Sequence, residues 1–344
     1  MPLAERAATS SLSTPPTEAP IPSGEGTLAL GLEAALLDGA RRYTRVEVAR
    51  LTGTPVERLE KLWRAMGFAD VDDETKLFSD DDVAAVRTLD EFAATGFLDV
   101  EREASLARVL GQGMARMAEW QVRELRAALQ AAGGDVGTAG PEVIGYLTAE
   151  LLPRMQRLQD YMWRRHLVSI AGRALASEEE QLDAVELVVG FADLVGFTSL
   201  SRTLLQSELG ELVEAFESRV AEVVAVNRGR VVKTMGDGVL FVADDVASGA
   251  EIALGLLEAM ATDESLPALR VGLAKGTVLT RLGDVYSSTV NLASRLTGLA
   301  KPDSVLVDGA VAEALEGDPR YRLRRLGRVS VRGLERQRPW LLRR

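Results

Sequence analysis

The sequence contains no cysteine in its 344 residues. This absence excludes disulfides, thiolate metal sites and cysteine nucleophiles, and it is compatible with a reducing compartment. No window holds the roughly 18 uninterrupted apolar residues that a membrane-spanning helix needs. The N-terminus also lacks a basic segment followed by an apolar one, as a signal peptide would have. We therefore expect a soluble, cytoplasmic protein without a membrane span.

An excess of positive charge is absent as well. The formal net charge is −11, so nonspecific binding to nucleic acid or to an anionic membrane has no electrostatic support across the whole chain. Hydrophobic residues make up 47% of the chain, which is enough to give each of two domains a core.

The pattern of residues divides the chain into three parts. Residues 1–26 are rich in Pro, Ser and Thr and nearly free of large apolar side chains, which predicts a disordered tail. Residues 27–177 repeat apolar positions every three or four residues, as in an all-helical domain. After the acidic passage "SEEEQLDAVE" the period changes, and residues 178–344 alternate between strand and helix patterns.

The order of elements in the last part predicts an α+β fold with a ferredoxin-like βαββαβ core, its helices on one face of the sheet. A further strand near 304–307, a short helix and terminal strands from Tyr321 would extend this core. The expected strands are 186–193, 230–234, 239–243, 269–275 and 277–282, and the expected helices are about 205–227, 246–260 and 289–299.

Two carboxylates are expected to meet at one end of this sheet. Asp193 ends the apolar run in "LVVGFADLVGFTSL", and Asp237 lies at the tip of a hairpin in "RVVKTMGDGVLFV". Such a pair suits a divalent cation, because Mg²⁺ prefers one or two carboxylates, waters and substrate phosphates. The backbone N–H groups of Gly196, Phe197 and Thr198 then form a candidate phosphate cradle.

A third stretch, "GDVYSSTVNLASRLTGLA", places an amide and a guanidinium on one helical face. Asn291 and Arg295 are four residues apart and therefore point the same way from a helix that begins near Thr289. They could act on a common ligand. Each candidate residue also has an ordinary interpretation: a turn aspartate for Asp193 or Asp237, and a solvated helix face for Asn291 and Arg295.

"FADLVGFT", "KTMGDG" and "TVNLASRL", in this order and spacing, resemble the class III nucleotidyl cyclases, the family of adenylyl and guanylyl cyclase domains. The resemblance covers about half the chain, from Val185 onward. It implies two metal ions per site, Mg²⁺ or Mn²⁺, and an in-line attack of the ribose 3′-OH on the α-phosphorus. By this resemblance, the metal ligands are Asp193, Asp237 and the carbonyl of Leu194. It likewise implies that the purine is selected by Lys233 and Asp284. The ribose would be oriented by Asn291, and the transition state would be stabilised by Arg295.

The residues matched to the purine favour ATP over GTP. Lysine only donates hydrogen bonds and ionised aspartate only accepts them, so Lys233 suits adenine N1 and Asp284 the N6 amino group. Only 5 of the 40 basic residues are lysine, so Lys233 is not what the composition would supply by default. The implied function is an adenylyl cyclase that forms 3′,5′-cyclic AMP and pyrophosphate. The alternatives are a guanylyl cyclase and a nucleotide-sensing regulator that binds DNA.

The resemblance also implies a homodimer. In this family the metal aspartates come from one subunit and the remaining site residues from the other. Because this chain carries both sets, two copies would form two complete sites, and a monomer would be inactive.

The helical part looks like a regulatory domain. "VEVARLTGTPVERLEKLWRAMGF" is similar to a MerR-type helix-turn-helix, with Arg58, Lys61 and Arg64 as the basic groups that DNA would need. Acidic residues at 70–74 and 80–82 would repel phosphates, so we do not expect DNA binding. The region from Thr27 onward resembles the N-terminal regulatory domain of actinobacterial adenylyl cyclases.

The signal that such a domain would read is left open by the sequence. The single histidine, His166, either supports the helix structurally or acts as a pH switch before the catalytic domain. The apolar helices either form an ordinary core or enclose a small-molecule or lipid-like regulator.

Overall fold

The computed structural model describes residues 33–37, 41–96, 99–131, 141–176, 184–263, 265–281, 283–328 and 338–344. The chain divides into two compact units, Met1–Arg173 and Ala174–Arg344. Residues 1–26, for which the sequence predicts a disordered tail, lie outside the described residues.

The described part of the first unit is helical, as predicted. The two helices at Arg45–Thr52 and Val56–Ala65 are joined by a tight turn at Gly53, whose φ of 78° is accessible to glycine at little cost. Thr44 caps the first helix in a capping box with Glu47. The elements are α3 (Arg45–Thr52), α4 (Val56–Ala65), α5 (Asp80–Ala94), α6 (Val100–Ala131), α7 (Pro141–Tyr146), the π-helical segment η2 (Leu147–Leu151) and α8 (Leu152–Ala176).

A small core holds the first helices of this unit together. Val48, Leu59, Phe78 and Val83 are buried against one another, and the ring of Trp63 packs edge-on against that of Phe78. Among the described residues, no helix is long and apolar enough to cross a lipid bilayer.

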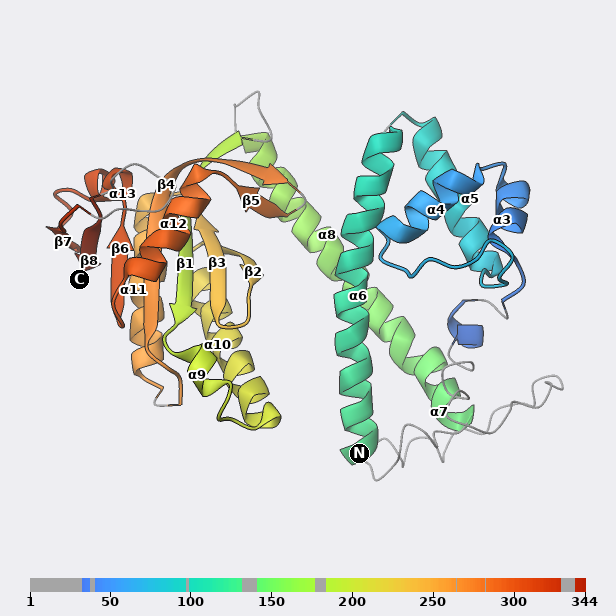
Figure 1. The fold of residues 1–344 in the computed structure, drawn as a ribbon, viewed down its shortest axis with the longest axis horizontal. Helices are drawn as coiled ribbons and strands as arrows, with labels where there is room; N and C mark the ends of the chain where they lie inside the picture. The colour runs from blue at the N-terminus through green and yellow to red at the C-terminus, as the bar shows by residue number, and fades with distance from the viewer. Residues whose placement is uncertain are drawn as a thin grey trace. The chain divides into compact units, whose positions relative to one another are not determined.

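The second unit is built on one mixed sheet with the strand order β2-β3-β1-β4-β6-β8-β7, in which β5 pairs with β4 (Figure 1). β1 lies centrally and is antiparallel to both β3 and β4. The strands are β1 (Ala184–Leu194), β2 (Arg230–Thr234), β3 (Gly238–Ala243), β4 (Leu269–Arg281), β5 (Asp284–Tyr286), β6 (Ser304–Val307), β7 (Arg322–Arg325) and β8 (Trp340–Arg343). The helices are α9 (Phe197–Leu200), α10 (Gln206–Val226), α11 (Val246–Ala261), α12 (Ser288–Leu299) and α13 (Gly309–Ala314).

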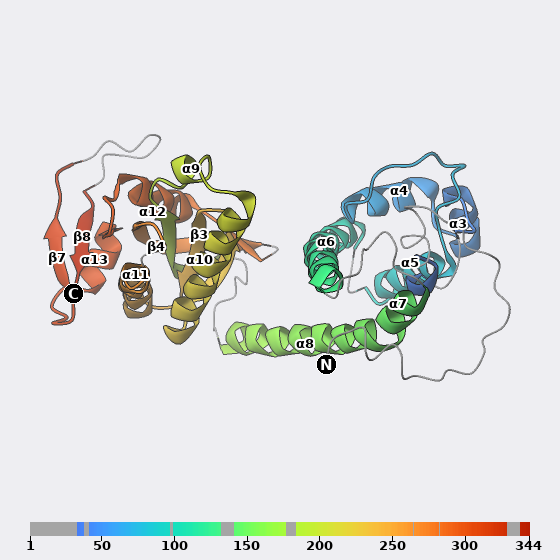
Figure 2. The ribbon, with the colours of Figure 1, turned by 90° about the horizontal axis from the view of Figure 1, so that it is seen from below.

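The predicted α+β class and ferredoxin-like core are confirmed, since β1, α10, β2, β3, α11 and β4 follow in that order with the strands arranged 2-3-1-4. The placement of all helices on one face was wrong. Phe216 of α10 and Ile252 of α11 pack on one face, whereas Ala293 of α12 packs against Leu187 and Val189 on the other. Figure 2 shows α11 and α12 on opposite sides of β4.

A second correction concerns β4, which is one continuous strand of 13 residues. The sequence predicted two strands here, at 269–275 and 277–282. All eleven residues of β1 pair with β4, from Ala184 opposite Leu279 to Leu194 opposite Leu269, so the ladder runs straight through Gly276. The short strand β5 was not predicted.

Candidate functional site

The end of β1 and the tip of the β2–β3 hairpin meet. Asp193 is paired in register with Gly238, the residue after Asp237, and the N–H of Leu194 donates to the carbonyl of Asp237 at 2.9 Å. Gly236, with a φ of 72°, turns the hairpin. Both carboxylates are half-buried and belong to the same sheet end, as the sequence predicted.

One residue at this end was missed by sequence reasoning. Arg270 lies directly opposite Asp193 in the ladder between β1 and β4. Its Nε donates to Asp193 Oδ2 at 2.8 Å, and its Nη2 forms an ion pair with the same oxygen. The signal that could have found it is register, because aligning β1 against β4 places the two residues side by side.

The chain turns sharply after β1. Gly196 has a φ of 77° and precedes the four-residue helix α9, which begins with Phe197 and Thr198. The first N–H groups of any helix lack acceptors inside the helix. The three residues predicted to form a phosphate cradle therefore lie in the segment that leaves the carboxylate end of the sheet.

Lys233 and Asp284 lie 51 residues apart in sequence but form an ion pair. Lys233 Nζ donates to Asp284 Oδ2 at 2.5 Å, and their side chains are 41% and 23% exposed. Partial burial raises the pKa of Asp284, but the Lys233 hydrogen bond and charge and the N–H of Val285 lower it, leaving it below its usual value. A solvent-accessible donor and an ionised acceptor thus stand side by side.

Asn291 and Arg295 lie on α12, four residues apart. Asn291 is exposed and Arg295 half-buried, with Nη1 of Arg295 buried and without a hydrogen-bond partner in the described part of the chain. An unpaired buried donor costs on the order of 1–3 kcal/mol, which a ligand oxygen would offset. Ser287 is the N-cap of α12, and its side chain accepts from the N–H of Val290.

The six motif residues therefore form three pairs: the two carboxylates, the ion pair, and the two side chains of α12. Within the described residues, no hydrogen bond or ion pair connects one pair with another. The arrangement offers hard oxygen ligands for a divalent metal, a donor and acceptor suited to a base edge, and an arginine available to an anion.

The regulatory candidate His166 lies far from these pairs in the sequence, on α8 of the first unit. Its side chain is exposed, as are those of its neighbours from Tyr161 to Ile170. It does not belong to the described core of that unit.

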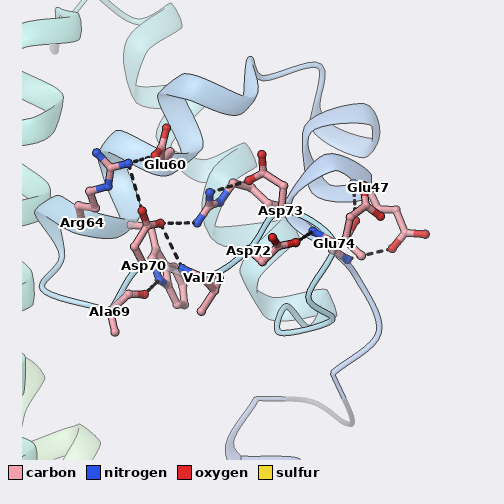
Figure 3. Close-up of polar contacts among 12 residues, drawn as sticks. Glu47, Glu60, Arg64, Ala69, Asp70, Val71, Asp72, Asp73 and Glu74 are labelled. Carbon is pink, nitrogen blue, oxygen red and sulfur yellow. Dashed lines mark hydrogen bonds and ion pairs between the residues drawn. The ribbon is translucent and has the colours of Figure 1, made fainter.

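The helix-turn-helix-like part of the first unit has its arginines engaged in internal ion pairs. Arg58 binds Asp90 and Glu103, each at 2.5 Å. Arg64 forms ion pairs with Glu60 and Asp70, as Figure 3 shows. Two of the three basic groups that DNA would require are therefore already neutralised.

The acidic loop after α4 is held by a buried arginine. Arg45 is 3% exposed and donates to Asp70 at 2.9 Å and to Asp73 at 2.6 Å. This loop therefore carries carboxylates at the surface of the module, where a nucleic acid would be repelled.

Comparison with known proteins agrees with this architecture. Residues 178–344 match the adenylate and guanylate cyclase catalytic domain, and residues 27–167 match the adenylate cyclase regulatory domain.

Relatives match over both regions. An adenylate cyclase of Streptomyces coelicolor is 44% identical over 93% of this chain and 90% of its own length. An adenylate cyclase of Streptomyces griseus is 47% identical over 84% of this chain and 72% of its own. A pH-sensitive adenylate cyclase of Mycobacterium tuberculosis is 32% identical over 79% and 70%. The chain therefore belongs to the adenylate cyclases of the class III family, and its regulatory domain precedes its cyclase catalytic domain.

Proposed function

We propose that this enzyme converts ATP to 3′,5′-cyclic AMP and pyrophosphate in the cytoplasm, at two sites shared between two copies of the chain. The assignment of ATP as the substrate rests on the Lys233–Asp284 ion pair, whose two charged atoms are 2.5 Å apart. Adenine offers an acceptor at N1 and a donor at N6, which matches lysine and ionised aspartate, whereas guanine offers the opposite pattern.

The reaction is an intramolecular phosphoryl transfer. The ribose 3′ oxygen attacks the α-phosphorus and loses its proton, while the bond from the α-phosphorus to the bridging oxygen breaks and pyrophosphate leaves with the electron pair. The protein must therefore orient the ribose and neutralise charge that develops on the phosphates.

Asp193, Asp237 and the carbonyl of Leu194 are the ligands we assign to Mg²⁺ or Mn²⁺, two ions per site. The donor set fits, because both carboxylates are half-buried at one sheet end and all three groups are hard oxygen ligands. When bound, such ions lower the pKa of the attacking hydroxyl and neutralise phosphate charge. The turn at Gly196, Phe197 and Thr198 would hold phosphate oxygens through backbone N–H groups.

Arg270 has a place in the same proposal. Its planar guanidinium binds a carboxylate oxygen of Asp193 through two nitrogens. The same donors suit a phosphate, so we assign Arg270 to the triphosphate beside the metal ligands.

Asn291 and Arg295 orient the ribose and stabilise the transition state in this proposal. Among the described residues no hydrogen bond or ion pair joins Asn291 or Arg295 to Asp193 or Asp237, so nothing in this chain ties the two sets into one site, and a partner copy could complete each. The Nη1 of Arg295 is buried and has no hydrogen-bond partner among the described residues, which supports assigning Arg295 to an anionic ligand.

The decisive test is product formation by the full chain from ATP and from GTP, with Mg²⁺ or Mn²⁺, beside Lys233→Ala. We expect cyclic AMP as the main product, and a fall of about 100-fold or more in the preference for ATP over GTP in the variant. Lys301→Ala, which removes an exposed lysine elsewhere, is the control. Cyclic GMP as the main product of the unaltered chain would overturn the substrate assignment, and no product from either would overturn the function.

We further propose that residues 27–177 regulate the catalytic domain, which begins near residue 178. The relative named for pH sensitivity motivates a proton as the input, read by His166 on the exposed α8, with a small molecule or lipid as the alternative. Equal rates for the full chain and a fragment starting at Glu180 would contradict regulation. An unchanged pH–activity profile in His166→Ala would remove the histidine from it.

A further inference from the structure

A buried threonine connects α12 to the central strand. Thr297 is 4% exposed, and its Oγ1 donates to the carbonyl of Phe191 at 3.1 Å and to that of Ala293 at 3.0 Å. A hydroxyl has one proton, so the two acceptors share it. The contact with Phe191 spans 106 positions in the sequence and links the helix to β1.

The helix approaches the sheet closely at this point. Gly272 of β4 is paired in register with Phe191. A Cβ added to Gly272 would lie 2.4 Å from the carbonyl of Ala293 and 2.7 Å from Thr297 Oγ1. The missing side chain of Gly272 therefore leaves the space into which the hydroxyl fits.

The contact lies close in sequence to both half-sites that one chain carries in this proposal. Thr297 follows Arg295 by two residues on α12, and Phe191 precedes Asp193 by two residues on β1. A shift of a helix along its axis by one residue moves every side chain by about 1.5 Å. A misplacement of about 1 Å can cost up to 100-fold in rate.

We infer that Thr297 is a positioning residue for Arg295 and Asn291. Its hydroxyl fixes the depth and rotation of α12 on the sheet, which in turn fixes where the guanidinium meets the substrate. This inference rests on the proposed function, because it concerns the transition-state role given to Arg295.

Another threonine on the same helix provides a matched comparison. Thr289 also stands over a glycine of β4, since a Cβ on Gly276 would lie 2.6 Å from Thr289 Oγ1. In the described part of the chain the side chain of Thr289 makes no hydrogen bond. Replacing each threonine by valine makes the same chemical change on one helix, but only at position 297 does it remove a contact with β1.

The test measures steady-state kinetics of the full chain with ATP for Thr297→Val, Thr297→Ser and Thr289→Val. We expect Thr297→Val to lower kcat about tenfold with KM little changed, because the interaction acts on the transition state. Thr297→Ser keeps the hydroxyl and should recover most of kcat, and Thr289→Val should stay close to the unaltered chain. Thr297→Ala, measured in parallel, keeps the test available if the valine variant does not fold.

Several results would overturn this inference. They are a kcat of Thr297→Val equal to that of the unaltered chain, an equal loss in Thr289→Val, or no recovery in Thr297→Ser. Activity of the unaltered chain separates the failure of this inference from the failure of the proposed function. If the unaltered chain forms cyclic AMP but Thr297→Val is fully active, only the role of Thr297 fails. If the unaltered chain forms none, the function and this inference fail together.

Discussion

At the residue scale, Lys233 and Asp284 hold each other in place before any base arrives. Their ion pair joins β2 to β5 and keeps a donor and an acceptor at a fixed separation. Ion pairs in contact with water contribute little to the free energy of folding. Because this pair is partly exposed, we expect it to orient the two side chains more than it stabilises the fold. A base entering here replaces one set of polar partners with another.

The lowered pKa of Asp284 predicts how selectivity responds to pH. A carboxylate whose folded pKa is below its unfolded value of about 3.9 stays ionised at neutral pH, and its contribution to stability is lost only as the pH falls through the folded pKa. We therefore expect the ATP-to-GTP ratio of kcat/KM to be the same at pH 8 and pH 5.5. Initial rates with both nucleotides at each pH would measure it.

A loss of selectivity between these pH values would contradict an ionised Asp284. Total activity is not the correct readout for this prediction, because other groups of the enzyme and of the substrate can titrate in the same range. The ratio for two nucleotides cancels those contributions, which act on ATP and GTP alike.

Residue identities were predictable at this scale because the motifs carry them. Asp193, Asp237, Lys233, Asp284, Asn291 and Arg295 were all proposed from their order and spacing, and their roles stay predictions. Arg270 was not proposed, because its position opposite Asp193 follows from the register between β1 and β4, and the sequence analysis assigned no register.

At the element scale, α12 packs closely on the sheet because β4 has glycines beneath it. Gly272 and Gly276 lie under it on β4, and both would collide with α12 if they carried a side chain. Gly276 lies between the two strands that the sequence predicted, but in the structure it is part of the continuous β4 and leaves room for Thr289 of α12. The hydrophobic period and the residue propensities of a strand describe that strand alone. How closely a helix approaches it depends on both elements, so it cannot be read from the strand's own sequence.

This packing predicts a stability difference between two glycines. Gly272→Ala places a Cβ 2.4 Å from backbone atoms of α12, so either helix or strand must shift, which costs about 1–3 kcal/mol in free energy of unfolding. Gly298→Ala lies on α12 with nothing within 4 Å of the added atom, and the better helix propensity of alanine should leave stability equal or raise it by up to about 1 kcal/mol. Urea unfolding of the full chain, followed by circular dichroism, compares them.

Equal urea midpoints for Gly272→Ala and Gly298→Ala would show that α12 can move away from position 272 without loss of unfolding free energy. That result would also weaken the case that the helix is held at a fixed depth on the sheet.

At the scale of the whole molecule, each copy of the chain carries two half-sites in our proposal. Mixing Asp193→Ala chains with Arg295→Ala chains should then restore activity, because a mixed dimer contains one site with all its residues. Random exchange makes half of the dimers mixed, each with one intact site of two, so about a quarter of the unaltered activity is expected. Cyclic AMP formation after co-expression measures this.

The control mixes Asp193→Ala with Asp237→Ala. Both substitutions damage the metal side of a site, so every mixed dimer has two damaged sites and no activity should return. Equal activity in the two mixtures, or none in either, would contradict shared sites.

The sequence by itself determined the family, the α+β class and the identities of the motif residues, because these depend on local period and on the order of a few chemically necessary side chains. The tertiary structure decided what depends on contacts between distant segments: the pairing of Arg270 with Asp193, the continuity of β4, and the position of α12 on the opposite face. It also showed Arg58 engaged in ion pairs with Asp90 and Glu103. Such contacts form between residues tens of positions apart, where no local pattern in the sequence records them.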